Sequence, residues 1–246
     1  MAVFQFTFKR YEKKYLLTEE QYGQLLKKLE GRMVDDQYAH SLINNIYYDT
    51  PDFLLIRRSL EKPVYKEKLR LRAYGVPKDE SKVFIEIKKK YEGVVYKRRI
   101  FVPYGQAIDY LAGKAPCPQP GQIGNELDYF IKCYPGLQPA MFISYERYSL
   151  ASPTDSILRI TFDRNITWRL HDLDLRLGVY GEKLNLDGKV LMEVKIPEAM
   201  PLWLAHLFDE LCIRRVSISK YGRAYCKALS DGTVDPVKAA QLMILQ

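Results

Sequence analysis

Seven segments of the chain alternate charged with apolar residues, and this alternation constrains the fold more than any other feature of the sequence. In a β-strand, residues two apart share one face of the sheet. One such segment places Lys68, Arg70 and Arg72 on a common face. The opposite face of the same segment carries Leu69 and Leu71. The pattern predicts strands whose two faces differ sharply in polarity.

The other six segments repeat the pattern with charges of both signs. Their polar-face residues are Arg10, Glu12, Lys14, Glu86, Lys88, Lys90, Lys97, Arg99, Tyr145, Arg147, Arg159, Thr161, Asp163, Glu193 and Lys195. On any single strand, an ordinary sheet with one solvated face explains this alternation equally well. Seven strands together favour a barrel that directs the charged face into its interior.

Periodicity and turn residues predict eight strands and six helices. The strands are expected at residues 3–17, 42–49, 65–74, 83–91, 94–102, 139–150, 157–168 and 190–196. Thr18 and Gln21 form a capping-box pattern for a first helix that stops at Gly31. Further helices are expected at residues 51–60, 106–111, 123–134, 202–211 and 219–229. We therefore expect an α+β domain over residues 1–229, a closed antiparallel β-barrel of about eight strands with flanking helices, and a C-terminal tail over residues 230–246.

The composition favours phosphate-rich partners. The chain has 38 Lys and Arg against 30 Asp and Glu, a net charge of +8, and a positive field concentrates polyanions. Dispersed surface lysines would give the same balance. The four cysteines form no C-x-x-C pair, and no stretch reaches the roughly 18 apolar residues of a membrane span. We expect a cytoplasmic protein, with association with a membrane partner left open.

Several short blocks, in their order along the chain, resemble the VTC domain, the polyphosphate polymerase domain of the vacuolar transporter chaperone family. The blocks are Arg10-Tyr11-Glu12-Lys13-Lys14-Tyr15, Tyr47-Tyr48-Asp49-Thr50, Lys68-Leu69-Arg70-Leu71-Arg72, Glu86-Ile87-Lys88, Ser144-Tyr145-Glu146-Arg147, Glu193-Val194-Lys195 and Ser219-Lys220-Tyr221. The resemblance implies a triphosphate tunnel metalloenzyme related to the CYTH hydrolases, with a β-tunnel that holds triphosphate along its axis.

The resemblance also implies roles for individual residues. Catalytic phosphate contacts fall to Arg70, Arg72, Lys88, Arg147 and Lys195. Further phosphate-binding positions are Arg10, Lys14, Lys68, Lys97, Arg99, Arg159 and Lys220. Arginine suits such a lining because its planar guanidinium binds phosphate oxygens in pairs and stays charged. For Lys220 a solvated basic helix face is the alternative.

Carboxylates on the charged face could hold a divalent metal. Mg²⁺ or Mn²⁺ needs only one or two carboxylates when phosphate oxygens complete its coordination. Glu193 is the first candidate ligand, with Glu12 and Glu86 as further ones. A structural salt bridge with a facing arginine is the rival role for Glu193.

The expected function is transfer of the γ-phosphate of ATP to polyphosphate. Related hydrolases open with two alternating glutamates before a lysine, whereas this chain has Arg10, Glu12 and Lys14, which argues against a two-carboxylate hydrolytic site. A metal-dependent triphosphatase or nucleoside triphosphatase, and a non-catalytic polyphosphate-binding module, remain alternatives. Nucleic acid is a less favoured partner, because no RNP-like aromatic motif accompanies the charge. Because like charges would repel one another in the interior, replacing Arg70 or Arg72 by alanine is expected to leave the melting temperature unchanged or to raise it.

Overall fold

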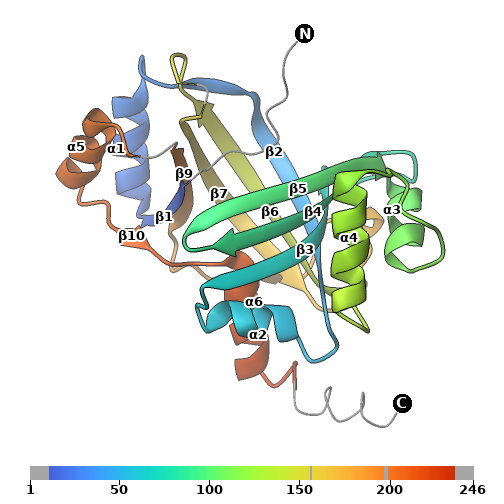
Figure 1. The fold of residues 1–246 in the computed structure, drawn as a ribbon. Coiled ribbons are helices and arrows are strands. Elements are labelled where there is room, and N and C mark those ends of the chain that lie inside the picture. The colour runs from blue at the N-terminus through green and yellow to red at the C-terminus, as the bar shows by residue number, and fades with distance from the viewer. Residues whose placement is uncertain (1–10, 156, 197–198, 236–246) are drawn as a thin grey trace.

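The computed structural model describes residues 11–155, 157–196 and 199–235, and its main feature is a curved ten-stranded antiparallel sheet (Figure 1). The strands are β1 (Tyr11–Leu17), β2 (Val34–Asp49), β3 (Tyr65–Tyr74), β4 (Lys82–Tyr91), β5 (Val94–Pro103), β6 (Gln138–Ala151), β7 (Arg159–Arg169), β8 (Glu182–Lys183), β9 (Val190–Ile196) and β10 (Arg215–Val216). Their order in the sheet is β10-β1-β9-β7-β6-β2-β3-β4-β5, and β8 pairs with β7.

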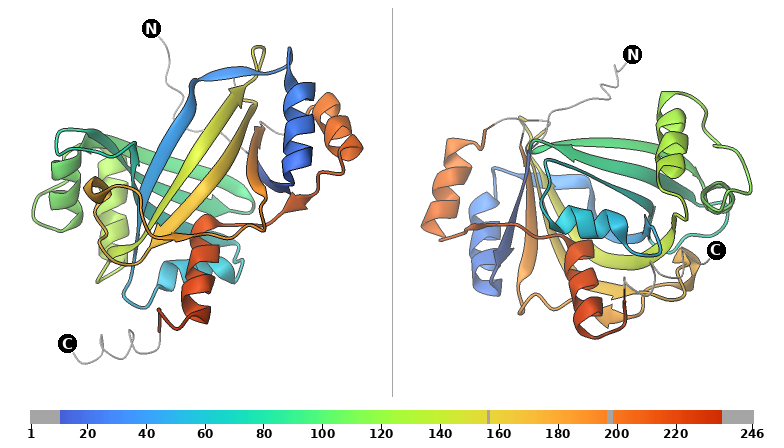
Figure 2. Two further views of the ribbon diagram at one scale, coloured as in Figure 1. Left: turned by 180° about the vertical axis from the view of Figure 1, so that it is seen from behind. Right: turned by 60° about the horizontal axis from the view of Figure 1, so that its bottom comes forward.

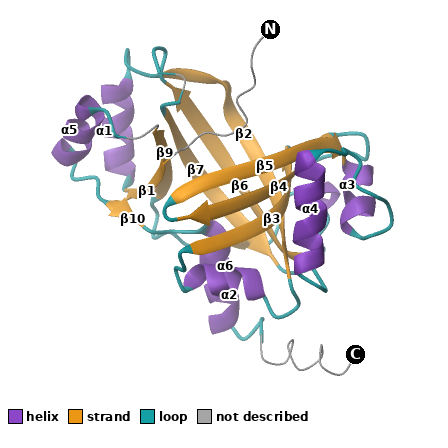
Figure 3. Ribbon diagram, viewed as in Figure 1, coloured by secondary structure: helices purple, strands orange, loops and turns teal. Residues whose placement is uncertain are grey.

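Helices lie around the outside of the sheet and at one of its ends (Figures 2 and 3). They are α1 (Glu19–Leu29), α2 (Leu54–Leu60), α3 (Tyr104–Leu111), α4 (Gln122–Cys133), α5 (Leu202–Glu210) and α6 (Lys220–Ser230), together with a 3₁₀ turn at Leu175–Leu177. Thr18 caps α1 in a capping box with Gln21, as predicted. None of the described helices is both long and apolar enough to cross a membrane.

The apolar face of the sheet points outward and is covered by helices. Leu69 and Ile85 of the β3–β4 hairpin are fully buried in one core with Leu127 of α4. Tyr15 of β1 and Val194 of β9 belong to a second core that includes side chains of α1 and α5. Since the apolar residues are used on the outside, the charged residues of the same strands face the concave side.

The sheet is not closed by backbone hydrogen bonds, so the predicted closed barrel is not confirmed. In the described residues the strand path ends at β5 on one side and at β10 on the other. Side chains bridge this opening instead: Lys88 Nζ of β4 lies 3.0 Å from a carboxylate oxygen of Glu12 on β1. Contacts between such non-neighbouring strands show how strongly the sheet curls.

One end of the concave side is filled by α6. Tyr221 and Tyr225 of this helix pack in a third core with Ile143, Trp168 and Leu191 from three strands of the sheet. The fold continues into the predicted tail, because α6 ends at Ser230 and Val234 is buried in the same core. The predicted strand residues 3–10 and the tail residues 236–246 lie outside the described ranges.

Strand β2 is longer than the predicted segment 42–49. Its first half is mostly polar, which gives no strand signal, but it pairs with β6 from Val34 onward. Tyr148 supports this pairing by donating a 2.7 Å hydrogen bond to Asp35. Cross-strand pairing therefore decides the conformation here against local composition. The two-residue strands β8 and β10 are too short to give any periodic signal.

Candidate functional site

The concave side of the sheet holds a group of charged side chains that we call the central cluster. Seven strands and the first residue of α6 supply it, with nine cations and four carboxylates. Its members are Glu12, Lys14, Lys68, Arg70, Arg72, Glu86, Lys88, Lys97, Arg147, Asp163, Glu193, Lys195 and Lys220.

Four members form a closed ring of alternating charge. Arg147 donates two hydrogen bonds to Asp163, of 2.6 and 2.7 Å, and a third of 3.1 Å to Glu193. The ammonium of Lys220 completes the ring, 2.5 Å from Asp163 and 3.1 Å from Glu193. Burial opposes ionisation of Glu193, but Lys14, Lys220 and Arg147 outweigh it and hold its pKa well below the usual range.

Lys220 enters the ring because α6 begins at the edge of the cluster. The Ser219 hydroxyl caps the helix by accepting a 3.1 Å hydrogen bond from the backbone N–H of Gly222. The next residue, Lys220, is only 7% exposed, and its ammonium lies 4.3 Å from the ring centre of Tyr145. This position rules out the alternative of a solvated helix face for Lys220.

A second group surrounds Glu86, which is 1% exposed. The guanidinium groups of Arg70 and Arg72 lie 2.7 and 3.9 Å from its carboxylate, and the ammonium of Lys97 also forms an ion pair with it. Burial raises the pKa of Glu86, but Arg70, Arg72 and Lys97 lower it by more, and it ends well below the usual range. Arg72 is further fixed by hydrogen bonds of 2.9 Å to Asn45 and to the Tyr145 hydroxyl.

Lys14 lies between two carboxylates, Glu193 directly opposite it on β9 and Glu12 two residues before it on β1. Its ammonium is 3.2 Å from Glu193 and 3.5 Å from Glu12. Burial lowers the pKa of Lys14, but Glu193 and Glu12 outweigh that effect and raise it above its usual value. The same two carboxylates are the best placed to hold a divalent cation together with phosphate oxygens.

The carboxylates of the central cluster are too few to hold a metal ion by themselves. They fit a metal ion whose coordination shell is completed by phosphate oxygens. Within the described ranges, no three His, Cys, Asp or Glu side chains are grouped as a metal site. Glu12 and Glu193 therefore fit the pattern of Mg²⁺ and Mn²⁺, which take one or two carboxylates and complete their shell with phosphate oxygens and water. Glu86 fits less well, because it is 1% exposed against 7% for Glu193, and a metal with its phosphate and water ligands needs access to the carboxylate.

Two cations of the cluster, Lys68 and Lys195, form no ion pair with a described carboxylate. Lys68 donates a 3.3 Å hydrogen bond to the Ser219 hydroxyl and lies 5.7 Å from the ring centre of Tyr221. Burial, Lys14 and Lys88 lower the pKa of Lys68 to about 7. Burial and Arg147 likewise lower that of Lys195 to about 8. Both side chains have unused capacity to bind an anion.

Three predicted residues are not in the central cluster. The side chain of Arg159, at the start of β7, is 43% exposed and pairs with Asp36 at 3.4 Å. Arg99 is exposed and lies over the ring of Phe84 at 4.9 Å. Arg10 falls outside the described residues.

Sequence reasoning missed several polar residues that hold the cluster in place. Asn45 binds Arg72, and the Tyr47 hydroxyl accepts a 3.3 Å hydrogen bond from Arg70. Tyr47 also stacks on Tyr221 with ring centres 4.5 Å apart. A signal was available, because Asn45 and Tyr47 alternate with buried Ile46 in the same parity as the charged faces.

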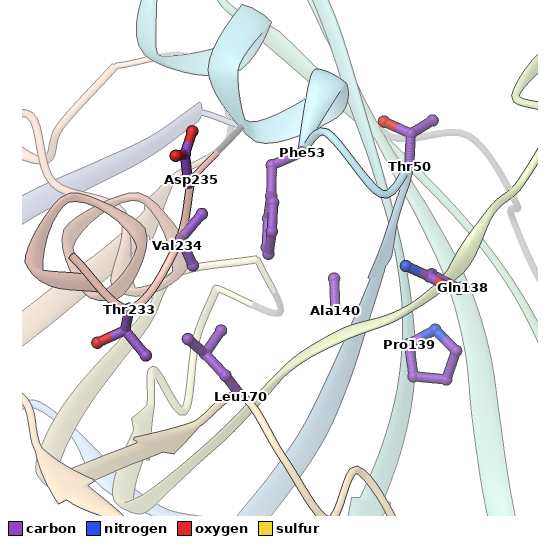
Figure 4. Close-up of a pocket in the computed structure, with 9 residues that line it drawn as sticks. All are labelled: Thr50, Phe53, Gln138, Pro139, Ala140, Leu170, Thr233, Val234 and Asp235. Atoms are coloured by element: carbon purple, nitrogen blue, oxygen red, sulfur yellow. The ribbon is translucent and has the colours of Figure 1, made fainter. Parts of the chain in front are cut away.

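A separate pocket of about 260 Å³ lies near the start of α2 and the segment after α6 (Figure 4). Phe53, Ala140, Leu170 and Val234 give it an apolar lining, and Asp235 lies at its margin. No member of the central cluster lines this pocket. It is therefore not a candidate for polyanion binding.

Comparison with known structures supports the fold. A candidate adenylate cyclase from Bacillus halodurans superposes with a TM-score of 0.56 at 16% identity, over 86% of this chain and 94% of that one. A candidate adenylyl cyclase from Hippeastrum, which has a dominant triphosphatase activity, gives a TM-score of 0.52 at 15% identity, over 92% and 98%. At such identities the likeness establishes the fold alone.

Comparison with known sequences establishes the family. No curated protein sequence matches the chain. The family model of the VTC domain matches residues 9–229, which include Lys14, Arg147, Glu193 and Lys220. That span covers both the curved sheet and the helix that completes the central cluster, and the chain belongs to the VTC domain family.

Proposed function

We propose that this chain is a polyphosphate polymerase that moves the γ-phosphate of ATP onto the end of a polyphosphate chain. The observation that carries the proposal is that nine cations and only four carboxylates gather at the concave side of the sheet. This surplus suits a ligand with several negative charges along a line. Membership of the VTC domain family supports the same reading.

The reaction needs positioning and charge neutralisation more than covalent help from the protein. A terminal oxygen of the polyphosphate attacks the γ-phosphorus, the bond from that phosphorus to the bridging oxygen breaks, and ADP leaves with the electron pair. In this scheme Arg70, Arg72 and Arg147 bind phosphate oxygens and hold donor and acceptor in line. Lys88 and Lys195 neutralise charge on the moving group.

The carboxylates have two roles in this proposal. Glu193 and Glu12 would hold Mn²⁺ or Mg²⁺, which when bound supplies positive charge to the phosphate oxygens. Glu86 and Asp163 balance the buried arginines and keep their guanidinium groups oriented. Before the ligand binds, the ion pairs hold the cationic side chains in position. The phosphate oxygens then compete with the carboxylates for these cations.

A metal-dependent triphosphatase is the second candidate. The Hippeastrum protein of the same fold has a dominant triphosphatase activity, and water could replace the polyphosphate oxygen as the acceptor. Arg10 argues against this candidate, because it stands where related hydrolases carry the first of two alternating glutamates. A protein that only binds polyphosphate is the third candidate.

Incubation with ATP and Mn²⁺ separates the three. Long polymer on a gel, with stoichiometric ADP, supports the polymerase. Free phosphate without polymer identifies a triphosphatase, and tight polyphosphate binding with unchanged ATP identifies a binding module. Glu193→Ala should abolish turnover, whereas Glu210→Ala, which removes a surface carboxylate that pairs with Lys28, should leave it unchanged.

A further inference from the structure

Strands β3 and β4 place lysine opposite lysine at two successive positions of the concave face. The register sets Lys66 opposite Lys90 and Lys68 opposite Lys88. Like charges directly opposite each other on antiparallel strands destabilise a sheet. We call these four residues the lysine ladder.

Elsewhere on the same hairpin, facing charges are compensated. On the outer face, Glu67 lies opposite Lys89, which also lies 3.9 Å from Glu126. One step further into the concave side, Arg70 lies opposite Glu86 and pairs with it at 2.7 Å. Within the described part of the chain, the contact of Lys88 with Glu12 is the only ion pair that the ladder makes.

The ladder runs from the central cluster to the open end of the hairpin. Lys68 and Lys88 belong to the cluster, and Lys66 and Lys90 lie one step outward. The next cross-strand pair, Tyr65 with Tyr91, is exposed at 46% and 47%. These tyrosines have the parity of the outer face, and their exposure places the outer rung beside the exposed end of the hairpin.

Lys66 is held in place at the outer rung of the ladder. Its ammonium donates a 3.0 Å hydrogen bond to the carbonyl of Ser59 in the last turn of α2. Carbonyl groups at a helix C-terminus attract cations. Burial, Lys90 and Lys62 together lower the pKa of Lys66. The charged form of Lys66 is therefore disfavoured at this position, and a bound polyanion would stabilise it.

We propose that the lysine ladder binds the part of a polyphosphate chain that extends beyond the central cluster, and that it makes the protein prefer long chains to triphosphate. The inference rests on the proposed function. Successive rungs are about 6.6 Å apart, since a strand rises about 3.3 Å per residue. A linear polyanion neutralises both rungs as it runs along them, whereas a triphosphate held in the cluster leaves the outer rung empty.

The test compares the binding of two ligands to the wild type and to one double variant. Dissociation constants for tripolyphosphate and for polyphosphate of about 100 units are measured on the wild type and on Lys66→Gln/Lys90→Gln. We expect the preference for the long chain, taken as the ratio of the two affinities, to fall by about fivefold to tenfold. The salt dependence of long-chain binding should also become shallower, because fewer cations contact the polymer.

Matched variants control for net charge and for folding. Lys13→Gln/Lys89→Gln removes two lysines from outward-facing positions of β1 and β4 and should keep the wild-type ratio. Lys66→Arg/Lys90→Arg keeps both positive charges and should also show the wild-type ratio. A melting curve of each variant confirms that it is folded before binding is measured.

An unchanged ratio in Lys66→Gln/Lys90→Gln would overturn the proposal, and so would an equal fall in the outward-facing control. A single-stranded oligonucleotide of equal charge that binds the ladder more tightly than polyphosphate would also overturn it. Failure of the proposed function looks different, because then the wild type forms no polymer from ATP and Mn²⁺. A wild type that forms polymer, with a ratio insensitive to the ladder, contradicts this inference alone.

Discussion

Arg147 and Asp163 lie directly opposite each other on β6 and β7, and their side chains form two parallel hydrogen bonds of 2.6 and 2.7 Å. The backbone register thus fixes a planar guanidinium against a planar carboxylate. Lys220 and Glu193 close the ring on the other side. The ring joins residues that are far apart in the sequence, so it can form only when β6, β7, β9 and α6 are all in place.

Asp163→Asn should destabilise the protein strongly. Asp163 is fully buried, and its loss leaves Arg147 and Lys220 to share Glu193 alone. Breaking one partner out of a buried ionic network costs about 3–5 kcal/mol of unfolding free energy. Urea denaturation measures the loss, with Asp79→Asn as an exposed control; a loss below about 1 kcal/mol would contradict the ring's structural role.

Arg70→Ala should lower stability, which reverses the prediction from sequence alone. Like-charge repulsion suggested an unchanged or higher melting temperature, but Arg70 pairs with Glu86, which is 1% exposed. Removing the arginine leaves that buried carboxylate short of a partner, at a cost of about 2–4 kcal/mol. In the double variant Arg70→Ala/Glu86→Gln the loss should be smaller than the sum of the two single losses. A double-mutant cycle by urea denaturation checks this coupling, and strict additivity would refute it.

Lys68→Met should stabilise the protein at neutral and acidic pH. The pKa of Lys68 is about 7 in the folded protein against 10.5 for an unperturbed lysine. Between those values the unfolded chain binds more protons, so stability rises with pH across that window. The substitution removes the penalty and should raise the unfolding free energy by about 1–3 kcal/mol at pH 6.5. Denaturation at pH 6.5 and pH 9.5 tests both parts, and equal effects at the two values would contradict the buried-cation assignment.

Binding of tripolyphosphate at pH 8.5 should take up protons. A polyanion beside Lys68 and Lys195 raises their pKa values from about 7 and about 8, so both side chains become more fully charged in the complex. Calorimetry in two buffers of different ionisation enthalpy measures the uptake. Lys68→Gln should reduce it, and proton release by the wild type would contradict the prediction.

The sequence was sufficient to predict which residues share the concave face. In β3, parity alone separated Lys68, Arg70 and Arg72 from the leucines that pack outward. Parity cannot tell which side chains of a face reach the cluster. Arg99 lies opposite Glu86 but is exposed on the edge strand β5, and Arg159 pairs with Asp36 at the start of β7. Parity also cannot predict whether the sheet closes into a barrel, because closure depends on the register of the whole sheet.

Parity indicates that Asn45 and Tyr47 share the concave face, but the side chains that they contact could not be predicted from the sequence. Asn45 and Tyr47 orient Arg72 and Arg70 through contacts that appear only when β2 lies beside β3. Lys220 reaches the ring because Tyr221 packs against the inside of the sheet. A helical pattern alone was equally compatible with a solvated basic face.

The place of β1 in the sheet has a consequence for the order of folding. β1 comes first among the described strands, yet it pairs only with β9 and β10. During synthesis its backbone donors and acceptors therefore wait for neighbours that emerge some 180 residues later. Loop closure over such a separation is slow, so Lys14 pairs with Glu193 only after β9 has left the ribosome.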